Sequence, residues 1–213
     1  MRRLIRRLRR SILDTRIYDA IAAVRSSWQL AKWSRGRISP PLPSAVKAQI
    51  LREYGERFGL KVFVETGTYH GDMIYEVRNS FSRIFSVELS PALARTAQSR
   101  FRKKAHITVL EGDSASVLHG IIIPQLEAPT LFWLDAHYSG GETNRGTTET
   151  PIVDELRLVF ERQPAKDVVL IDDARFFGSG DYPSLVVVRR CAEEHGYSFS
   201  VENDIIRLAP APA

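Results

Sequence analysis

The chain of 213 residues contains a single cysteine, Cys191, which excludes an intramolecular disulfide and a thiolate-rich zinc site. It has no run of 18 consecutive apolar residues, so no transmembrane helix is predicted. Near the N-terminus, charged residues interrupt every apolar stretch, namely Asp14, Arg16, Asp19 and Arg25, and a secretory signal is therefore not expected. We expect a soluble, cytoplasmic protein that is at most attached to a membrane surface.

Positive charge is concentrated at one end of the chain. Residues 1–37 contain 11 Lys and Arg against two Asp, a net charge of +9, whereas the rest contains 19 Lys and Arg against 23 Asp and Glu, a net charge of −4. The basicity therefore belongs to an N-terminal arm. The remainder of the chain is mildly acidic and is not expected to present a general nucleic-acid surface.

The basic arm has the apolar spacing of a helix. Its apolar residues recur every three or four positions, which predicts one helical stripe. The members of this stripe are Leu4, Leu8, Ile12, Leu13, Ile17, Ile21, Val24 and Trp28. Such a helix can lie on an anionic membrane surface, or it can pack its stripe on the main domain or on a protein partner, including a second copy in a homodimer. Prolines at positions 40, 41 and 43 end the arm. We therefore divide the chain into an arm and linker, 1–43, and a domain, 44–213.

From residue 44 onward, short β-rich runs alternate with helical stretches. This pattern is typical of βαβ units around a buried parallel sheet. Strands are predicted at 61–65, 83–88, 106–110, 130–135 and 167–172, and helices at 45–58, 72–79, 91–103, 114–126, 151–163 and 183–194. The end of the chain, 197–209, reads as an antiparallel hairpin with its turn at Asn203 and Asp204. The expected fold class is α/β, a Rossmann-like doubly wound sheet, mostly parallel, with an antiparallel strand at the C-terminal end and a basic N-terminal helix.

Three predicted strand ends carry residues suited to a nucleoside ligand. Gly67 and Gly71 follow the first strand in a turn that opens a helix, where backbone can approach a ligand closely. Glu88 ends the second strand, at the spacing from Gly67 where a carboxylate can accept both ribose hydroxyls. Asp113, after the third strand, can meet an adenine amino group or simply cap the helix that begins at Ser114.

The segments Glu65-Thr-Gly-Thr-Tyr-His-Gly71, Glu88 and Glu111-Gly-Asp113, together with the final hairpin, resemble the class I S-adenosylmethionine (SAM)-dependent methyltransferases. The resemblance covers most of residues 44–213. It implies that the Gly67 turn holds the amino-acid part of the cofactor, Glu88 the ribose and Asp113 the adenine. The cofactor residues expected on this basis are Glu65, Gly67, Thr68, Gly71, Glu88, Asp113 and Ser114.

Carboxylates follow the next two predicted strands. Asp135 ends the fourth strand, while Asp172 and Asp173 end the fifth, and neighbouring strands lie about 5 Å apart. Three carboxylates at one mouth would repel each other unless a divalent cation, preferably Mg²⁺, neutralised them. Each aspartate also has an interpretation without a metal. Asp135 could be a solvated strand end, and Asp172 and Asp173 could cap the following turn. The arrangement resembles the metal-dependent O-methyltransferases of the catechol and macrolide-sugar types, which implies that the metal holds the acceptor hydroxyl and lowers its pKa.

The segment after the fourth strand offers a base. His137 could be a general base, a metal ligand or an ordinary loop residue. The catechol-type enzymes use a lysine just beyond their strand-four aspartate, and no lysine occurs in this loop, so the predicted catalytic residues are His137 and Asp135. The polar stretch 138–149 is long enough to act as a lid over substrate.

The favoured function is metal-assisted O-methylation of a small hydroxylated acceptor such as a sugar, a glycan intermediate or a natural product. An oxygen acceptor is preferred because the Pro-Pro-aromatic motif of nucleobase amino-methylating enzymes is missing after the fourth strand. Two alternatives stay open. One is a metal-independent methyltransferase-fold protein that acts on RNA or protein, with the arm as nucleic-acid contact. The other is a Rossmann dinucleotide-binding protein, disfavoured because Gly-x-Gly-x-x-Gly is missing.

Overall fold

The structure is a computed structural model that describes residues 16–36, 39–135, 151–162 and 166–211. Its described part forms one seven-stranded sheet in the order β3-β2-β1-β4-β5-β7-β6. The strands are β1 (Val62–Thr66), β2 (Arg83–Glu88), β3 (Ile107–Glu111), β4 (Thr130–Leu134), β5 (Val168–Ile171), β6 (Tyr197–Glu202) and β7 (Ile205–Pro210). Strands β1 to β5 are mutually parallel, and β7 runs antiparallel to both β5 and β6. The predicted fold class is confirmed.

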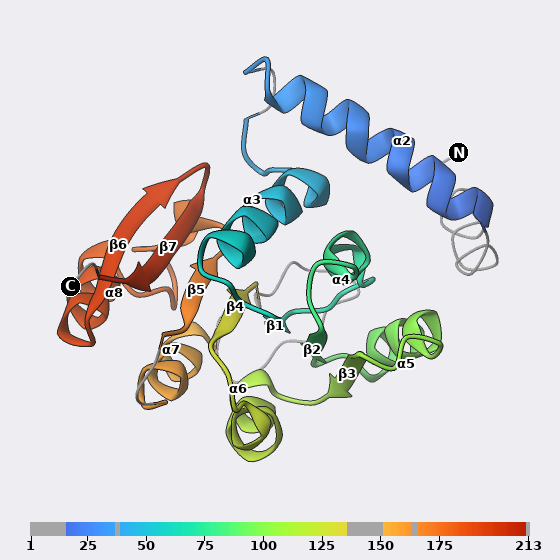
Figure 1. Ribbon diagram of the computed structural model, residues 1–213. Coiled ribbons are helices and arrows are strands. Elements are labelled where there is room, and N and C mark those ends of the chain that lie inside the picture. The colour runs from blue at the N-terminus through green and yellow to red at the C-terminus, as the bar shows by residue number, and fades with distance from the viewer. Residues whose placement is uncertain (1–15, 37–38, 136–150, 163–165, 212–213) are drawn as a thin grey trace.

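Helices cover both faces of the sheet (Figure 1). They are α2 (Arg16–Trp33), α3 (Ser44–Arg57), α4 (Asp72–Val77), α5 (Pro91–Phe101), α6 (Ser114–Val117), α7 (Ile152–Phe160) and α8 (Leu185–Glu194). Helices α3, α4 and α5 lie on one face, and α6, α7 and α8 lie on the other. Because β1 to β5 are parallel, their carboxyl ends meet at one edge of the sheet, and this edge holds those predicted site residues that the structure describes.

Successive side chains of a strand point to opposite faces of the sheet, and this divides the core into two apolar layers. We call the layer between the sheet and α3 the α3 layer, and the layer between the sheet and α7 the α7 layer. On β4, Trp133 packs in the α3 layer and Phe132 in the α7 layer, and both side chains are fully buried. On β1, Phe63 and Val64 divide in the same way. Apolar residues on both faces explain why these strands read as continuous hydrophobic runs in the sequence.

One predicted helix has a different form. The stretch predicted as a single helix at 114–126 is a short α-helix, α6, followed by a π-helical turn (Leu118–Ile122) and a 3-10 turn (Ile123–Gln125). Pro124 has no backbone N–H to donate, and Gly120 costs conformational entropy, so a regular α-helix is disfavoured here. The segment still buries Leu118 and Ile122 in the α7 layer.

The C-terminal hairpin contains the predicted tight turn. Asn203 and Asp204 have φ values of 55° and 62°, the left-handed conformation that both central residues of a type I′ turn require. Asn and Asp tolerate this conformation better than most residues. The turn returns the chain from β6 to β7, and β7 then pairs with β5.

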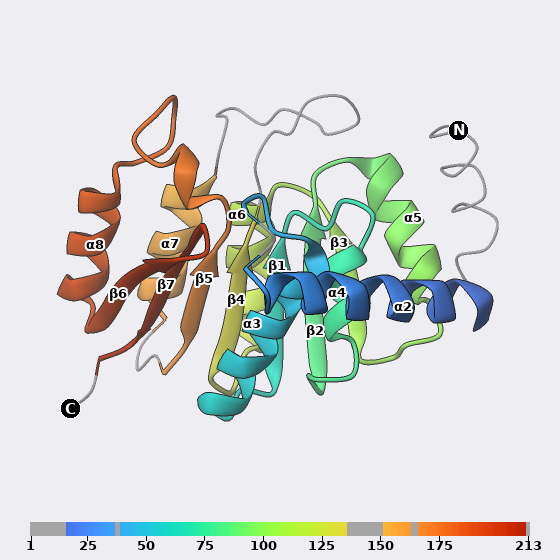
Figure 2. The same ribbon diagram turned by 90° about the horizontal axis from the view of Figure 1, so that it is seen from above.

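Helix α2 crosses the side of the domain that α3 and α4 cover (Figures 1 and 2). The face by which it packs differs from the predicted stripe. Leu30 and Trp33 pack against the core, and Ser26 Oγ donates a hydrogen bond to Glu76 Oε1 at 2.7 Å. Val24 and Trp28, the stripe members with described side chains, are 72% and 59% exposed. The alternative that the stripe packs on the main domain is therefore wrong for these two residues. The division of the chain at residue 43 stays a prediction. No helix in the described ranges is long and apolar enough to cross a membrane.

Candidate active site

The turn after β1 is held against β2 by backbone hydrogen bonds. The amides of Gly67 and Thr68 both donate to Val87 O, at 2.9 and 3.1 Å. Gly67 and Gly71 have φ values of 86° and 72°, which favour glycine. A Cβ on Gly71 would lie 2.7 Å from Phe101 Cε2, so this position has no room for a side chain. The turn is thus fixed close to the end of β2.

Beneath this turn lies a buried polar chain. Ser86 Oγ donates to Glu65 Oε2 at 2.6 Å and lies 2.5 Å from Thr68 Oγ1. Burial raises the pKa of Glu65 well above its ordinary value, and the hydrogen bond from Ser86 opposes the rise only in part. Two predicted cofactor residues, Glu65 and Thr68, are therefore linked through Ser86, which the sequence interpretation did not single out.

Glu88 connects the turn to the next strand end. Its Oε2 accepts a hydrogen bond from the amide of Tyr69 at 2.7 Å, and its Oε1 accepts one from the amide of Ser90 at 2.9 Å. Burial raises the pKa of Glu88, and these two amide hydrogen bonds lower it again in part. Each carboxylate oxygen has a second lone pair, so Glu88 retains acceptor capacity for ligand hydroxyls.

Asp113 caps helix α6. Its Oδ1 accepts a hydrogen bond from the amide of Ser116 at 2.9 Å, which is the capping role considered from the sequence. Ser114 is buried directly behind it. The amide of Gly112 donates a hydrogen bond to Glu88 O at 3.0 Å, and this holds the end of β3 alongside the end of β2. The adenine contact assigned to Asp113 stays a prediction.

A buried acid that the sequence interpretation missed lies at the same edge. Glu155 of α7 is 1% exposed, and among the described residues no partner of its carboxyl meets ordinary hydrogen-bond geometry, although the hydroxyls of Ser114 and Thr66 lie next to it. Burial raises its pKa to about 7, while the neighbouring hydroxyls of Ser114 and Thr66 oppose the rise. A signal was available in the sequence, because Glu155 occupies an apolar position in the spacing of Ile152, Leu156 and Val159.

The three predicted metal ligands do come together. Asp135, Asp172 and Asp173 each offer a carboxylate oxygen, and these oxygens lie within 4.8 Å of one another. The amide of Asp135 donates to Thr66 O, and the amide of Asp172 donates to Leu134 O, so the sheet ladder continues to the cluster. Burial and repulsion from Asp135 raise the pKa of Asp172, and Lys47 acts against this rise.

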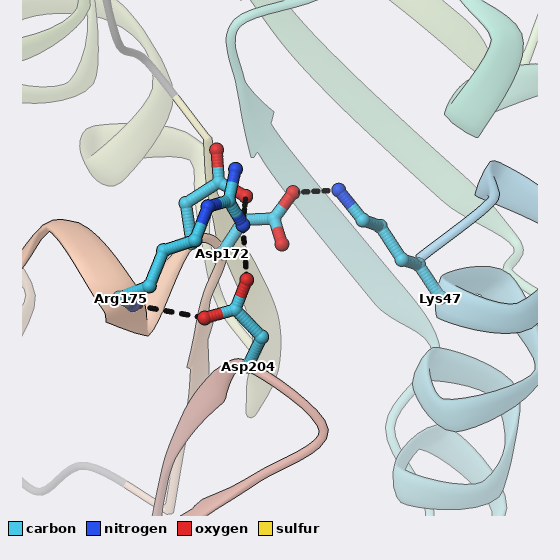
Figure 3. Close-up of polar contacts among 5 residues, drawn as sticks. Lys47, Asp172, Arg175 and Asp204 are labelled. Carbon is cyan, nitrogen blue, oxygen red and sulfur yellow. Dashed lines mark hydrogen bonds and ion pairs between the residues drawn. The ribbon is translucent and has the colours of Figure 1, made fainter. Parts of the chain in front are cut away.

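Lys47 is a third residue that the sequence interpretation missed, after Ser86 and Glu155. Its ammonium donates to Asp172 Oδ2 from the first turn of α3 (Figure 3). A cation in the first turn is disfavoured by the helix dipole, and Asp172 compensates for this. The signal was topological. A helix that leads into β1 begins near the carboxyl edge of the sheet, so a lysine in its first turns can reach the carboxylates there.

The hairpin turn holds Arg175, which pairs with the third carboxylate, and Figure 3 shows Arg175 against Asp204 of that turn. Arg175 Nη1 donates to Asp173 Oδ1 at 2.7 Å and also to Asp204 Oδ2, while the Arg175 amide donates to Asp204 Oδ1 at 2.8 Å. Asp173 has a φ of 57°, a left-handed conformation that is uncommon outside glycine. The fold therefore supplies two cations of its own, Lys47 and Arg175, to three carboxylates.

His137 and the loop 138–150 lie outside the described residues, so the predicted base and lid have no structural account.

The residues present are compatible with a divalent cation. Octahedral Mg²⁺ has oxygen ligands at about 2.1 Å, so opposite ligands lie roughly 4.2 Å apart. The offered oxygens of the cluster lie within 4.8 Å of one another, so they could converge on one such ion, and Asp172 would have to exchange Lys47 for the metal. For a nucleoside cofactor, the left-handed glycine turn and the buried acceptor Glu88 also fit.

The strand order and the reversed hairpin define a class I SAM-dependent methyltransferase fold. Among solved structures, the chain is similar to the O-methyltransferase TomG from Streptomyces achromogenes in complex with SAM. The identity is 16%, the TM-score is 0.57, and 90% of each chain is covered. It is also similar to the O-methyltransferase from Bacillus cereus in complex with S-adenosylhomocysteine (SAH), with 15% identity, a TM-score of 0.58, and coverage of 86% of this chain and 90% of that chain.

A third similar structure is SAH-bound PaMTH1 from Podospora anserina, with 15% identity, a TM-score of 0.51, and coverage of 85% of this chain and 86% of that chain. At these identities the similarity establishes the fold, which confirms the resemblance inferred from the motifs. No family model and no curated protein matches the sequence.

Proposed function

We propose that the chain is a SAM-dependent methyltransferase that methylates an oxygen of a small hydroxylated acceptor with the help of a divalent cation. One observation carries this proposal. The glycine turn beside Glu88 and the carboxylate cluster of Asp135, Asp172 and Asp173 lie at the same edge of the sheet. A cofactor at the first group and an acceptor at the second would therefore meet over the ends of β1 and β4.

The cofactor would be held by residues of three strand ends. Glu88 would accept the ribose hydroxyls, and the turn from Gly67 to Gly71 would receive the amino-acid part. Asp113 would lie at the adenine, with Ser114 and the buried Glu155 behind it. The buried carboxyl of Glu65 would keep the turn in place through Ser86 and Thr68.

Asp135, Asp172 and Asp173 would hold the cation, for which Mg²⁺ is the first candidate because all three ligands are oxygens. When bound, such a cation holds a hydroxyl and lowers its pKa. In the transfer itself, the acceptor oxygen bonds to the methyl carbon, the bond from that carbon to sulfur breaks, and SAH leaves. The hydroxyl proton goes to a base, and His137 is the residue we assign to this role.

A specific observation favours a second candidate, a methyltransferase without a metal. Lys47 pairs with Asp172, and Arg175 pairs with Asp173, so part of the repulsion that argues for a metal is already neutralised. In this version, which is open to RNA or protein acceptors, the cluster serves only as a polar wall of the site.

Calorimetry of the full chain with SAM and with NAD, each with and without MgCl₂, tests the proposal. We expect SAM to bind and NAD not to bind. Tight NAD binding without SAM binding would make the chain a dinucleotide-binding protein instead.

The cation is tested separately by thermal unfolding in MgCl₂ or EDTA. We expect Mg²⁺ to raise the melting temperature of the parent, and Asp172→Asn to lose most of this shift while SAM affinity stays nearly unchanged. Asp181→Asn, an exposed aspartate, is the matched control. If Mg²⁺ raised the melting temperatures of the parent and of Asp172→Asn equally, the cluster would not bind the cation, and the methyltransferase without a metal would be the remaining candidate.

A further inference from the structure

Helix α2 has two faces of opposite character. One face packs on the domain through Leu30 and Trp33. The other exposes Val24 and Trp28 at 72% and 59%. At 100° per residue, Val24 and Trp28 lie about 40° apart and roughly opposite to the packed face. The outward face therefore exposes two large apolar side chains, and nothing in the described part of the chain covers them.

Cations border this outward face. Arg25 and Arg35 are exposed, and Lys32 Nζ lies 3.8 Å from the centre of the Trp28 ring. The ammonium of Lys32 thus lies over the indole in a cation–π contact, next to the exposed apolar side chains. We call Val24, Arg25, Trp28 and Lys32, together with Arg35 of the turn that follows the helix, the outward surface of α2.

We propose that the outward surface of α2 binds an anionic lipid bilayer and holds the domain at a membrane. Charge complementarity selects this occupant, since residues 1–37 carry a net charge of +9 and the remaining chain a net charge of −4. A basic helix with an exposed tryptophan matches the headgroup region, where an indole places its ring in the apolar layer and its N–H in water.

The geometry also suits attachment parallel to the bilayer plane. Helix α2 is the outermost element on its side of the molecule and crosses the α3 and α4 region (Figures 1 and 2). Its packed face is tied to α4 through Ser26 and Glu76, so insertion of the opposite face does not require the helix to leave the domain.

Cosedimentation of the full chain with vesicles tests the proposal. The vesicles are either an equimolar mixture of phosphatidylglycerol and phosphatidylcholine or phosphatidylcholine alone. We expect binding to the anionic vesicles that weakens with added salt and with loss of phosphatidylglycerol. Val24→Glu and Trp28→Glu should each weaken partition about tenfold. Val186→Glu, which places the same charge at a valine that is 76% exposed on α8, should bind like the parent.

Tryptophan fluorescence gives a second measurement on protein that keeps its fold. Addition of anionic vesicles should shift the emission of the parent to shorter wavelength, and Trp28→Phe should lose this shift. Two results would overturn the proposal. One is parent-like vesicle binding by Val24→Glu and Trp28→Glu, which would assign the binding to charge elsewhere in the arm. The other is a dimer in sedimentation velocity that Val24→Glu dissociates without any vesicle binding, which would identify a second copy as the occupant.

Discussion

Lys47 and Asp172 are 125 positions apart in sequence and form a hydrogen-bonded ion pair at the mouth of the candidate site (Figure 3). The carboxylate is 3% exposed and the lysine 14%. The pair joins the first helix of the domain to the end of β5. It also places a cation of the protein on an oxygen that the proposed metal would need, so Lys47 and the metal compete for Asp172.

Lys47→Met should therefore change both stability and the metal response. Without metal, removal of one partner of a buried pair should lower the free energy of unfolding by about 3–5 kcal/mol, and by less where Asp172 takes up a proton. With Mg²⁺, the variant should gain more in melting temperature than the parent. Thermal unfolding in EDTA and in MgCl₂ measures both effects. Lys61→Met, at an exposed lysine, should behave like the parent. Equal Mg²⁺ shifts in Lys47→Met and the parent would contradict the competition.

Glu155 should make stability depend on pH. Burial raises its pKa to about 7 in the folded protein, against 4.5 as its ordinary value. The folded state then holds the proton more tightly than the unfolded state, so this contribution to stability is full below pH 4.5. It is lost as the pH rises toward about 7, and the cost is constant above that value.

Glu155→Gln removes this titration. Above pH 7 the variant should be more stable than the parent by up to about 3 kcal/mol, and below pH 4.5 the difference should vanish. Urea unfolding over a series of pH values measures the effect. Glu161→Gln, at an exposed carboxylate, should leave the pH profile unchanged. A parent-like profile in Glu155→Gln would mean that Glu155 is ionised in the folded protein.

A side chain at Gly71 would meet two obstacles, a left-handed backbone and a close contact with Phe101. A side chain at Gly59 would meet only the first of these. Both have positive φ, 72° and 65°, but a Cβ on Gly59 would meet nothing within 4 Å. Gly59→Ala should cost about 1–2 kcal/mol from the left-handed backbone alone. Gly71→Ala should cost roughly 1–3 kcal/mol more, because its Cβ would press on Phe101. Chemical denaturation of the two variants gives the comparison, and equal losses would refute the contact at Gly71.

Glu88→Ala should weaken SAM binding. It removes an acceptor for the ribose hydroxyls, and hydrogen bonds to a charged group contribute about 1.5–3 kcal/mol each. It also leaves the amide of Tyr69 without its acceptor, which loosens the turn. Calorimetry of the folded variant measures the loss. Glu111→Ala changes the exposed carboxylate at the register partner of Glu88 and should leave the affinity unchanged. Unchanged affinity in Glu88→Ala would place the cofactor elsewhere.

Local patterns in the sequence were sufficient for the fold class. Short apolar β-rich runs alternating with helical spacing predicted the parallel strands, and Asn203-Asp204 predicted the hairpin turn, because these features depend on residues close together in the chain. The convergence of Asp135 with Asp172 and Asp173 was also predictable, since neighbouring parallel strands end at the same edge. Apolar spacing was a poorer guide around Gly120 and Pro124. It predicted one continuous helix at 114–126, whereas the structure has a π-helical turn and a 3-10 turn after α6.

Tertiary structure alone decided which side chains neutralise these carboxylates and which face of α2 is packed. Lys47 reaches Asp172 from α3, and Arg175 is held between Asp173 and the distant Asp204, contacts that no local spacing encodes. The apolar period of the arm predicted a stripe but not its partner. Two apolar residues outside the stripe, Leu30 and Trp33, fit the core, and Val24 and Trp28 stayed in solvent. The physical reason is that sequence periodicity sets how residues are grouped around a helix, whereas the shape of the surface it meets determines which group is buried.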